Sequence, residues 1–166
     1  MKRMLLVSLV LVLVGTVFLP GAALAALPED FSASGTISAI SDPVEFAAGK
    51  SGRFVVEERT VTGALSGDVG GDFALTYRAN VELATQAGNL HGTLSVGSYV
   101  FRVQGKIEPL GFVPAPVLTI SGQWTLIEGA RGQGNFDAWA VFVPDAQGHV
   151  VFILASSITM TGQWQP

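Results

Sequence analysis

The chain has 166 residues, with 9 Lys and Arg against 13 Asp and Glu, and its formal net charge is −4. The basic residues are scattered singly and form no stripe, so neither nucleic acid nor an anionic membrane surface is an expected partner. The sequence contains no cysteine. This excludes disulfides, a lipoprotein anchor and a thiol nucleophile.

The first 25 residues have the pattern of a secretory signal peptide. Two cations precede an apolar run at residues 4–19, and an Ala-Leu-Ala string ends at Ala25 where a signal peptidase would cut. Cleavage there leaves residues 26–166 as a single domain, secreted or otherwise extracytoplasmic and free of the membrane. The alternative is an uncleaved anchor, although the apolar run is short for a hydrocarbon layer of about 30 Å.

After the signal segment the apolar residues recur with a period of two, which is typical of strands with one buried face. In residues 72–85, Phe73, Leu75 and Tyr77 fall on one face, while Thr76 and Arg78 fall on the other. Glycine-rich or polar turns of hairpin length connect most such segments. The predicted strands are residues 31–40, 53–66, 72–85, 90–96, 98–108, 117–127, 133–143 and 149–164.

Eight strands without a helical pattern predict an all-β fold, a single antiparallel up-and-down β-barrel. Closure of the barrel removes the free sheet edges that an open sheet would expose. A two-sheet β-sandwich is the alternative, because periodicity alone does not separate the two. The run of short hairpins favours the barrel.

A Gly-Gln-Trp string occurs twice, ending at Trp124 and Trp164, on the first and last of three successive predicted strands. Alternation places the Gly and Trp of both copies inward and the Gln outward, and inward glycines allow a small barrel to bend. The turn positions predict that Trp124 lies opposite Gly134, and that Ala138 lies opposite Leu154. In that register the two Trp side chains sit at different heights and form no common cage.

The inward positions predict the lining of a ligand cavity, if the barrel is hollow rather than filled. This lining comprises Tyr77, Tyr99, Phe101, Trp124, Phe136, Phe142 and Met160. The same parity predicts an apolar patch on the outer face, formed by Trp139, Val141, Val143, Val151 and Ile153. Such a patch indicates either a partner surface, here for a homo-oligomer, or a face covered by a loop or the N-terminal segment.

No catalytic, cofactor-binding or metal-binding residue is predicted. His91 and His149 stand beside turns with no acidic ligand at suitable spacing, and no Gly-x-Ser-x-Gly motif occurs. Arg131 reads as an exposed turn residue, because no second cation accompanies it to bind a phosphate. Two carboxylates could still converge across strands, and the candidates are Glu58, Glu82, Glu108, Glu128 and Asp137.

The run Gly-Ala-Arg-Gly-Gln-Gly-Asn-Phe, residues 129–136, resembles the G-x-x-G-x-G-x-F turn of the allene-oxide-cyclase-like and dirigent-like barrels. The resemblance covers the C-terminal part of the chain together with the strand count. It implies eight antiparallel strands around an apolar cavity, often in a trimer. No catalytic residue carries over, because the positions those enzymes use have no assignable match here.

Three functions remain open on the sequence. The first is an exported, non-enzymatic barrel that binds a small apolar ligand or a protein partner and needs no cofactor. The second is a cyclase-type or isomerase-type enzyme acting on an apolar substrate in the cavity. An enzyme requires a polar group inside, and Tyr77 and Tyr99 are the evident inward candidates. The third is a structural surface component assembled through the patch at Trp139.

Overall fold

The computed structural model describes residues 27–42, 46–48, 54–112, 116–144 and 150–166. These residues form nine β-strands and no helix. The strands are β1 (Glu29–Ile40), β2 (Phe46–Ala48), β3 (Phe54–Gly67), β4 (Gly71–Glu82), β5 (Gly88–Val96), β6 (Tyr99–Phe112), β7 (Pro116–Glu128), β8 (Arg131–Pro144) and β9 (Val150–Gln165).

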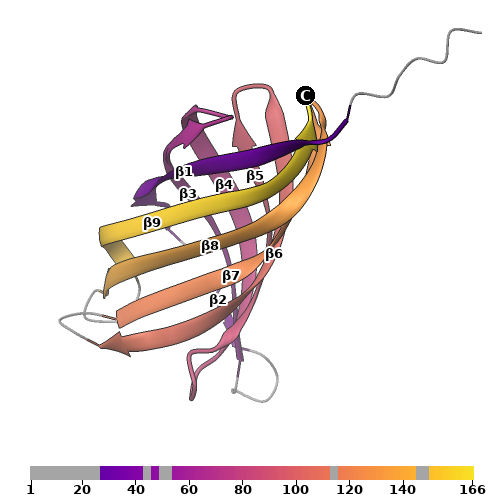
Figure 1. Ribbon diagram of the computed structural model, residues 1–166. Coiled ribbons are helices and arrows are strands. Elements are labelled where there is room, and N and C mark those ends of the chain that lie inside the picture. The colour runs from indigo at the N-terminus through magenta and orange to yellow at the C-terminus, as the bar shows by residue number, and fades with distance from the viewer. Residues whose placement is uncertain (1–26, 43–45, 49–53, 113–115, 145–149) are drawn as a thin grey trace, which may run out of the picture.

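The strands form one closed antiparallel sheet. From β3 to β9 each strand pairs with the next in sequence, and β1 closes the ring by pairing with both β9 and β3. β1 and the three-residue β2 both pair with β3, one after the other along its length, so nine strands occupy eight positions. Figure 1 shows the closed wall, with β8 and β9 curving around it. The predicted up-and-down barrel is confirmed, and the sandwich alternative is excluded.

The predicted alternation along the strands determines which side chains form the core. In β4, Phe73 and Leu75 are buried, whereas Thr76 and Arg78 are exposed. Similar inward side chains from the other long strands join them in one hydrophobic cluster inside the barrel. Each large apolar side chain that is fully buried contributes about 1.5–3 kcal/mol relative to its exposed state.

One end of the barrel is filled by aromatic rings. Phe31 is the centre of this group, with its ring centroid 4.8 Å from Trp124, 5.3 Å from Trp164 and 5.9 Å from Phe101. Tyr99 lies 5.8 Å from Trp164 and completes the group. These five side chains, here called the aromatic plug, occupy the end where β1 begins and β9 ends.

The two Trp side chains lie at different heights, as predicted, but closer together than the predicted register places them, and Phe31 joins them in one cluster. Trp124 pairs with Gly134, as predicted, but Trp164 pairs with Gly132, which precedes Gly134 in β8 by only two residues. The sequence-based register placed Trp164 too far away, and it gave no role to Phe31, which contacts both rings.

Glycines of β8 and β9 make room for the Trp124 indole. A Cβ on Gly134 would lie 2.8 Å from Trp124 Cε2, and a Cβ on Gly162 would lie 2.7 Å from Cζ2. The indole Nε1 donates hydrogen bonds to the carbonyl oxygens of Asn135 (3.0 Å) and Thr161 (3.2 Å). The Gly of the second Gly-Gln-Trp copy therefore accommodates the Trp of the first.

The pairing of β8 with β9 departs from the expected register. Ala138 pairs with Ile158 rather than with Leu154: the hairpin begins at Pro144 and Val150, two residues off the expected register, and two shifts in the ladder add the other two. In one shift, Val141 pairs with Ala155 and the following residue pairs with Ile153, which leaves Leu154 as the extra residue of a bulge. The bulge reverses the parity of this segment: Ile153 is 6% exposed and faces inward, whereas Leu154 is 56% exposed. The predicted outward orientation of Ile153 is therefore wrong.

Candidate functional site

The interior is hollow toward the end opposite the aromatic plug. A cavity of about 100 Å³ is lined by inward side chains of β3 between Glu57 and Val61, of β4 between Phe73 and Val81, and of the strands that face them. Its wall is mostly apolar and includes Ile37, Val61, Leu75, Leu90, Ile120 and Ile153. An apolar cavity of about 150 Å³ holds a benzene molecule. This smaller space therefore suits a branched hydrocarbon group, or a single ring that extends partly out of the cavity.

Two polar side chains interrupt this apolar wall. Glu57 and Tyr77 line the cavity, and the Tyr77 hydroxyl donates a hydrogen bond to Glu57 Oε1 at 3.2 Å. Arg59, on the same face of β3, forms an ion pair with Glu57, with 3.5 Å between its Nε and Glu57 Oε2. The Arg59 side chain is 1% exposed and that of Glu57 is 22% exposed. A charge this deeply buried is costly without a partner, so Arg59 and Glu57 depend on each other.

The buried position of Tyr77 controls its protonation. Burial raises the pKa of the Tyr77 hydroxyl well above its ordinary value of 10.0, and the negative charge of Glu57 raises it further. Tyr77 is therefore a neutral hydrogen-bond donor at physiological pH, and its proton is directed at Glu57. The cavity wall presents this one carboxylate, supported by a hydroxyl and a guanidinium, within a hydrocarbon surface.

Sequence reasoning identified Tyr77 as an inward residue but missed Glu57 and Arg59. Counting back along β3 in steps of two from the buried Leu65 would have placed both inside, with Val61 between them and Leu65. Three consecutive charged residues at positions 57–59 obscured this alternation. The Tyr77 hydroxyl also contacts Glu57 within the barrel instead of lying at the rim.

The cavity involves only part of the predicted lining. Three of the seven predicted side chains line it: Tyr77, Phe136 and Phe142. The other four lie outside its lining, and their assignment to it is corrected: Tyr99, Phe101, Trp124 and Met160. These four pack in the filled core, most of them in the aromatic plug, because the barrel is hollow at one end only.

The predicted outer patch is smaller than expected. Trp139 is 41% exposed on β8, and Val141 and Val143 beside it are half-buried. Ile153 faces inward, and the side chain of Val151 lies outside the described residues. Self-association through the face around Trp139 stays a prediction.

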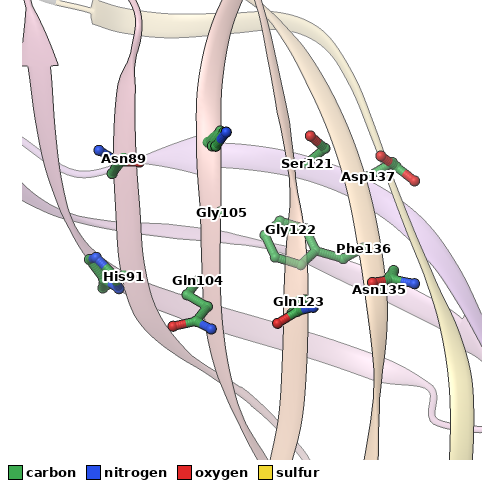
Figure 2. Close-up of a pocket in the computed structure, with 11 residues that line it drawn as sticks. Asn89, His91, Gln104, Gly105, Ser121, Gly122, Gln123, Asn135, Phe136 and Asp137 are labelled. Carbon is green, nitrogen blue, oxygen red and sulfur yellow. The ribbon is translucent and has the colours of Figure 1, made fainter.

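A second, shallow hollow of about 600 Å³ lies on the outer face of β5–β8. Figure 2 shows polar side chains around it, among them His91, Gln104 and Asp137. Of the other predicted candidates for chemistry, Glu58 forms an exposed ion pair with Arg78 at 3.5 Å, and His149 lies outside the described residues. Within the described ranges, no three His, Asp or Glu side chains gather closely enough to hold a metal ion.

Comparison of this chain with protein families, curated proteins and solved structures finds no match. In the described part of the chain, no helix has the length and apolar character needed to cross a membrane.

Proposed function

We propose that this protein binds a small apolar ligand that carries one hydroxyl group, inside the barrel. The observation that carries this proposal is the Glu57–Tyr77 pair on the wall of an otherwise apolar cavity of about 100 Å³. A binding site of this kind typically combines a hydrocarbon surface with a few well-placed polar groups that fix the orientation of the ligand.

Each part of the proposed ligand has a counterpart in the cavity. Burial of its hydrocarbon contributes about 0.8 kcal/mol per CH₂ group. Its hydroxyl donates to the Glu57 carboxylate, which is a strong acceptor because it is charged. An acidic ligand would face repulsion from Glu57, and Arg59 could not reach it, because Arg59 lies outside the cavity lining.

Two features of the sequence support this proposal. The resemblance of residues 129–136 to the allene-oxide-cyclase-like and dirigent-like barrels implies an apolar cavity. The signal-peptide pattern of residues 1–25 supports export, so we propose that the ligand is bound outside the cytoplasm.

A pair of matched probes tests the proposal. p-Cresol and toluene have nearly the same shape, but only p-cresol carries a hydroxyl group. Titration calorimetry should show millimolar or tighter binding of p-cresol, with toluene at least tenfold weaker, because only p-cresol can donate to Glu57. Equal affinities would rule out the role of Glu57, and the absence of binding by both probes would rule out the site.

A cavity-filling substitution locates the binding site. Ala140 is buried and lines the cavity, so Ala140→Leu should lower p-cresol affinity at least tenfold by occupying the space. Ala74→Leu adds the same volume on the exposed face of β4 and serves as the control. Unchanged binding by Ala140→Leu would place the ligand elsewhere.

The polar groups inside the barrel also favour a second candidate, an enzyme of the cyclase or isomerase type. Glu57 and Tyr77 provide a carboxylate and a neutral hydroxyl within reach of a cavity-bound substrate, which is the arrangement that general acid–base chemistry requires. The two functions differ in what happens to the natural ligand. If a compound extracted from the purified protein changes its retention time on incubation with fresh protein, the enzyme is favoured. If it is recovered unchanged, binding is favoured.

A further inference from the structure

The shallow hollow on the outer face of β5–β8 is bordered by two rows of polar side chains that cross four adjacent strands. Strand register places His91, Gln104, Gln123 and Asn135 side by side in the first row. It places Asn89, Lys106, Ser121 and Asp137 side by side in the second. All eight side chains are exposed, and Figure 2 shows the labelled members of both rows around the same hollow.

The floor between the two rows is formed by glycine backbone. Gly105 and Gly122 pair directly across β6 and β7, and a Cβ on Gly122 would lie 2.5 Å from Gly105 Cα. Phe136 covers the inner side of this floor, since a Cβ on Gly105 would meet its Cζ at 3.0 Å. The result is a hollow of about 600 Å³ whose floor is backbone and whose rims are polar side chains.

The hydrogen-bonding groups of this surface are available to a ligand. The rims contain four carboxamides, each of which both donates and accepts, and an imidazole and a hydroxyl that also do both. Within the described part of the chain, none of these side chains bonds to another member of the two rows. The one cation, Lys106, is balanced by one anion, Asp137.

We propose that this hollow binds a neutral oligosaccharide. Sugar hydroxyls donate and accept hydrogen bonds, which matches the dual character of the carboxamide rims. At about 4.8 Å between strands, four strands span about 14 Å, which suits several linked sugars better than a single one. The proposal is independent of the interior cavity, because the two sites lie on opposite faces of the barrel wall.

The composition of the hollow argues against other classes of ligand. Nucleic acid and anionic glycans require several cations, and the lining holds Lys106 as its single Lys or Arg. A protein interface is enriched in aromatic side chains at its centre, whereas the aromatic residue of this lining, Phe136, is buried on the inner side. The hollow also gives a role to Gln123, the outward residue of the first Gly-Gln-Trp copy.

The test is a ¹H–¹⁵N NMR titration of the protein with cellohexaose, maltohexaose and mannohexaose, each to about 10 mM, where a millimolar Kd is measurable. At least one of these glucans or mannans should shift the amide signals of Gln104, Gln123 and Asn135, while Phe31 in the aromatic plug stays unchanged. No response to any of the three overturns the proposal. So does a response confined to residues outside the hollow, or tighter binding of hexagalacturonate, an anionic glycan.

Substitutions then tie the binding to the two rows. The double variant Gln104→Ala, Gln123→Ala should fold normally, since both side chains are exposed, and should bind the responding hexasaccharide at least tenfold more weakly. The matched control is Thr93→Ala, Ser95→Ala, two exposed positions of β5 outside the hollow, which should bind as the wild type does. Equal affinity of both double variants overturns the proposal. Binding of p-cresol to the glutamine variant stays normal, which separates this site from the interior one.

Discussion

The two ends of the barrel interior solve the same packing problem differently. At one end the aromatic plug fills the space with five rings, and Trp124 packs over the glycines at 134 and 162. At the other end a cavity remains, with Glu57 and Arg59 paired in its vicinity. The inward side chains at the plug end therefore stabilise the fold. The end with the cavity instead contains empty space and charged side chains, which stability alone does not require.

Side-chain volume explains why the cavity lies where it does. At the plug, large rings face residues without side chains, so the wall and the rings fit closely. Around the cavity, Ala79, Ala138 and Ala140 point inward and contribute little volume. The interior is therefore hollow where the inward positions are alanines instead of large residues. The same strands run through both regions.

Removal of a plug ring should have the largest effect on stability. Trp124→Ala deletes a ring with 1% exposure that contacts Phe31 and Phe101, and we expect a loss of about 3–5 kcal/mol in the free energy of unfolding. Urea denaturation measures this loss. Trp139→Ala is the control, because 41% of that residue is exposed, and it should cost clearly less stability than Trp124→Ala. Equal losses in the two variants would contradict the assignment of stability to the plug.

A smaller change should test the space that the glycines provide. Gly162→Ala would place a Cβ 2.7 Å from both Trp124 Cζ2 and Gly134 Cα, and we expect a loss of about 1–3 kcal/mol through overpacking. Gly70→Ala is the control, since the nearest atom to a Cβ there is 3.5 Å away. Urea midpoints of the two variants give the comparison. If Gly162→Ala is as stable as Gly70→Ala, close packing against the β8 backbone at Gln133 and Gly134 and against the indole is not what requires glycine at 162.

The sequence predicted the parts of this fold that depend on regular alternation. Eight strands, barrel closure and the pairing of Trp124 with Gly134 follow from period-two patterns and a tight turn. The bulge at Leu154 did not follow, because one extra residue in a strand leaves no mark in an apolar segment where either parity is plausible. The clustering of both Trp rings around Phe31 depends on that register and on barrel closure, which joins residues far apart in the chain.

The candidate site was less predictable than the fold. Tyr77 was predicted to face inward because it is aromatic and continues the regular apolar alternation of β4. Glu57 and Arg59 were missed because charged residues are expected to face water, whereas their ion pair and the Tyr77 hydrogen bond to Glu57 help to compensate for the inward position. That compensation depends on tertiary contacts at the end of the barrel that holds the cavity. The aromatic residues of the plug, by contrast, are favourable to bury individually.

The polar contacts at the cavity should make the stability of the protein depend on pH, and this is the smallest of the three predicted effects on stability. Tyr77 has a pKa raised above 10.0 in the folded protein by burial and by Glu57, while in the unfolded chain it titrates near 10. Below pH 10 the hydroxyl is protonated in both states, and its contribution to stability is fully present. Above pH 10 the unfolded chain loses this proton first, so stability falls by up to about 1.4 kcal/mol per pH unit.

Tyr77→Phe removes that proton and the hydrogen bond to Glu57 together. At pH 7 the variant should be less stable than the wild type by about 0.5–1.5 kcal/mol, the usual value of one hydrogen bond. Because the variant lacks the alkaline loss, the two unfolding free energies should converge between pH 10 and pH 11, as measured by urea denaturation at each pH. A difference that stays constant from pH 7 to pH 11 would mean that Tyr77 ionises as readily in the folded barrel as in water. The wall of the cavity would then be wet, and the distinction between a dry hydrocarbon pocket with one polar contact and an ordinary solvent-filled opening would be lost.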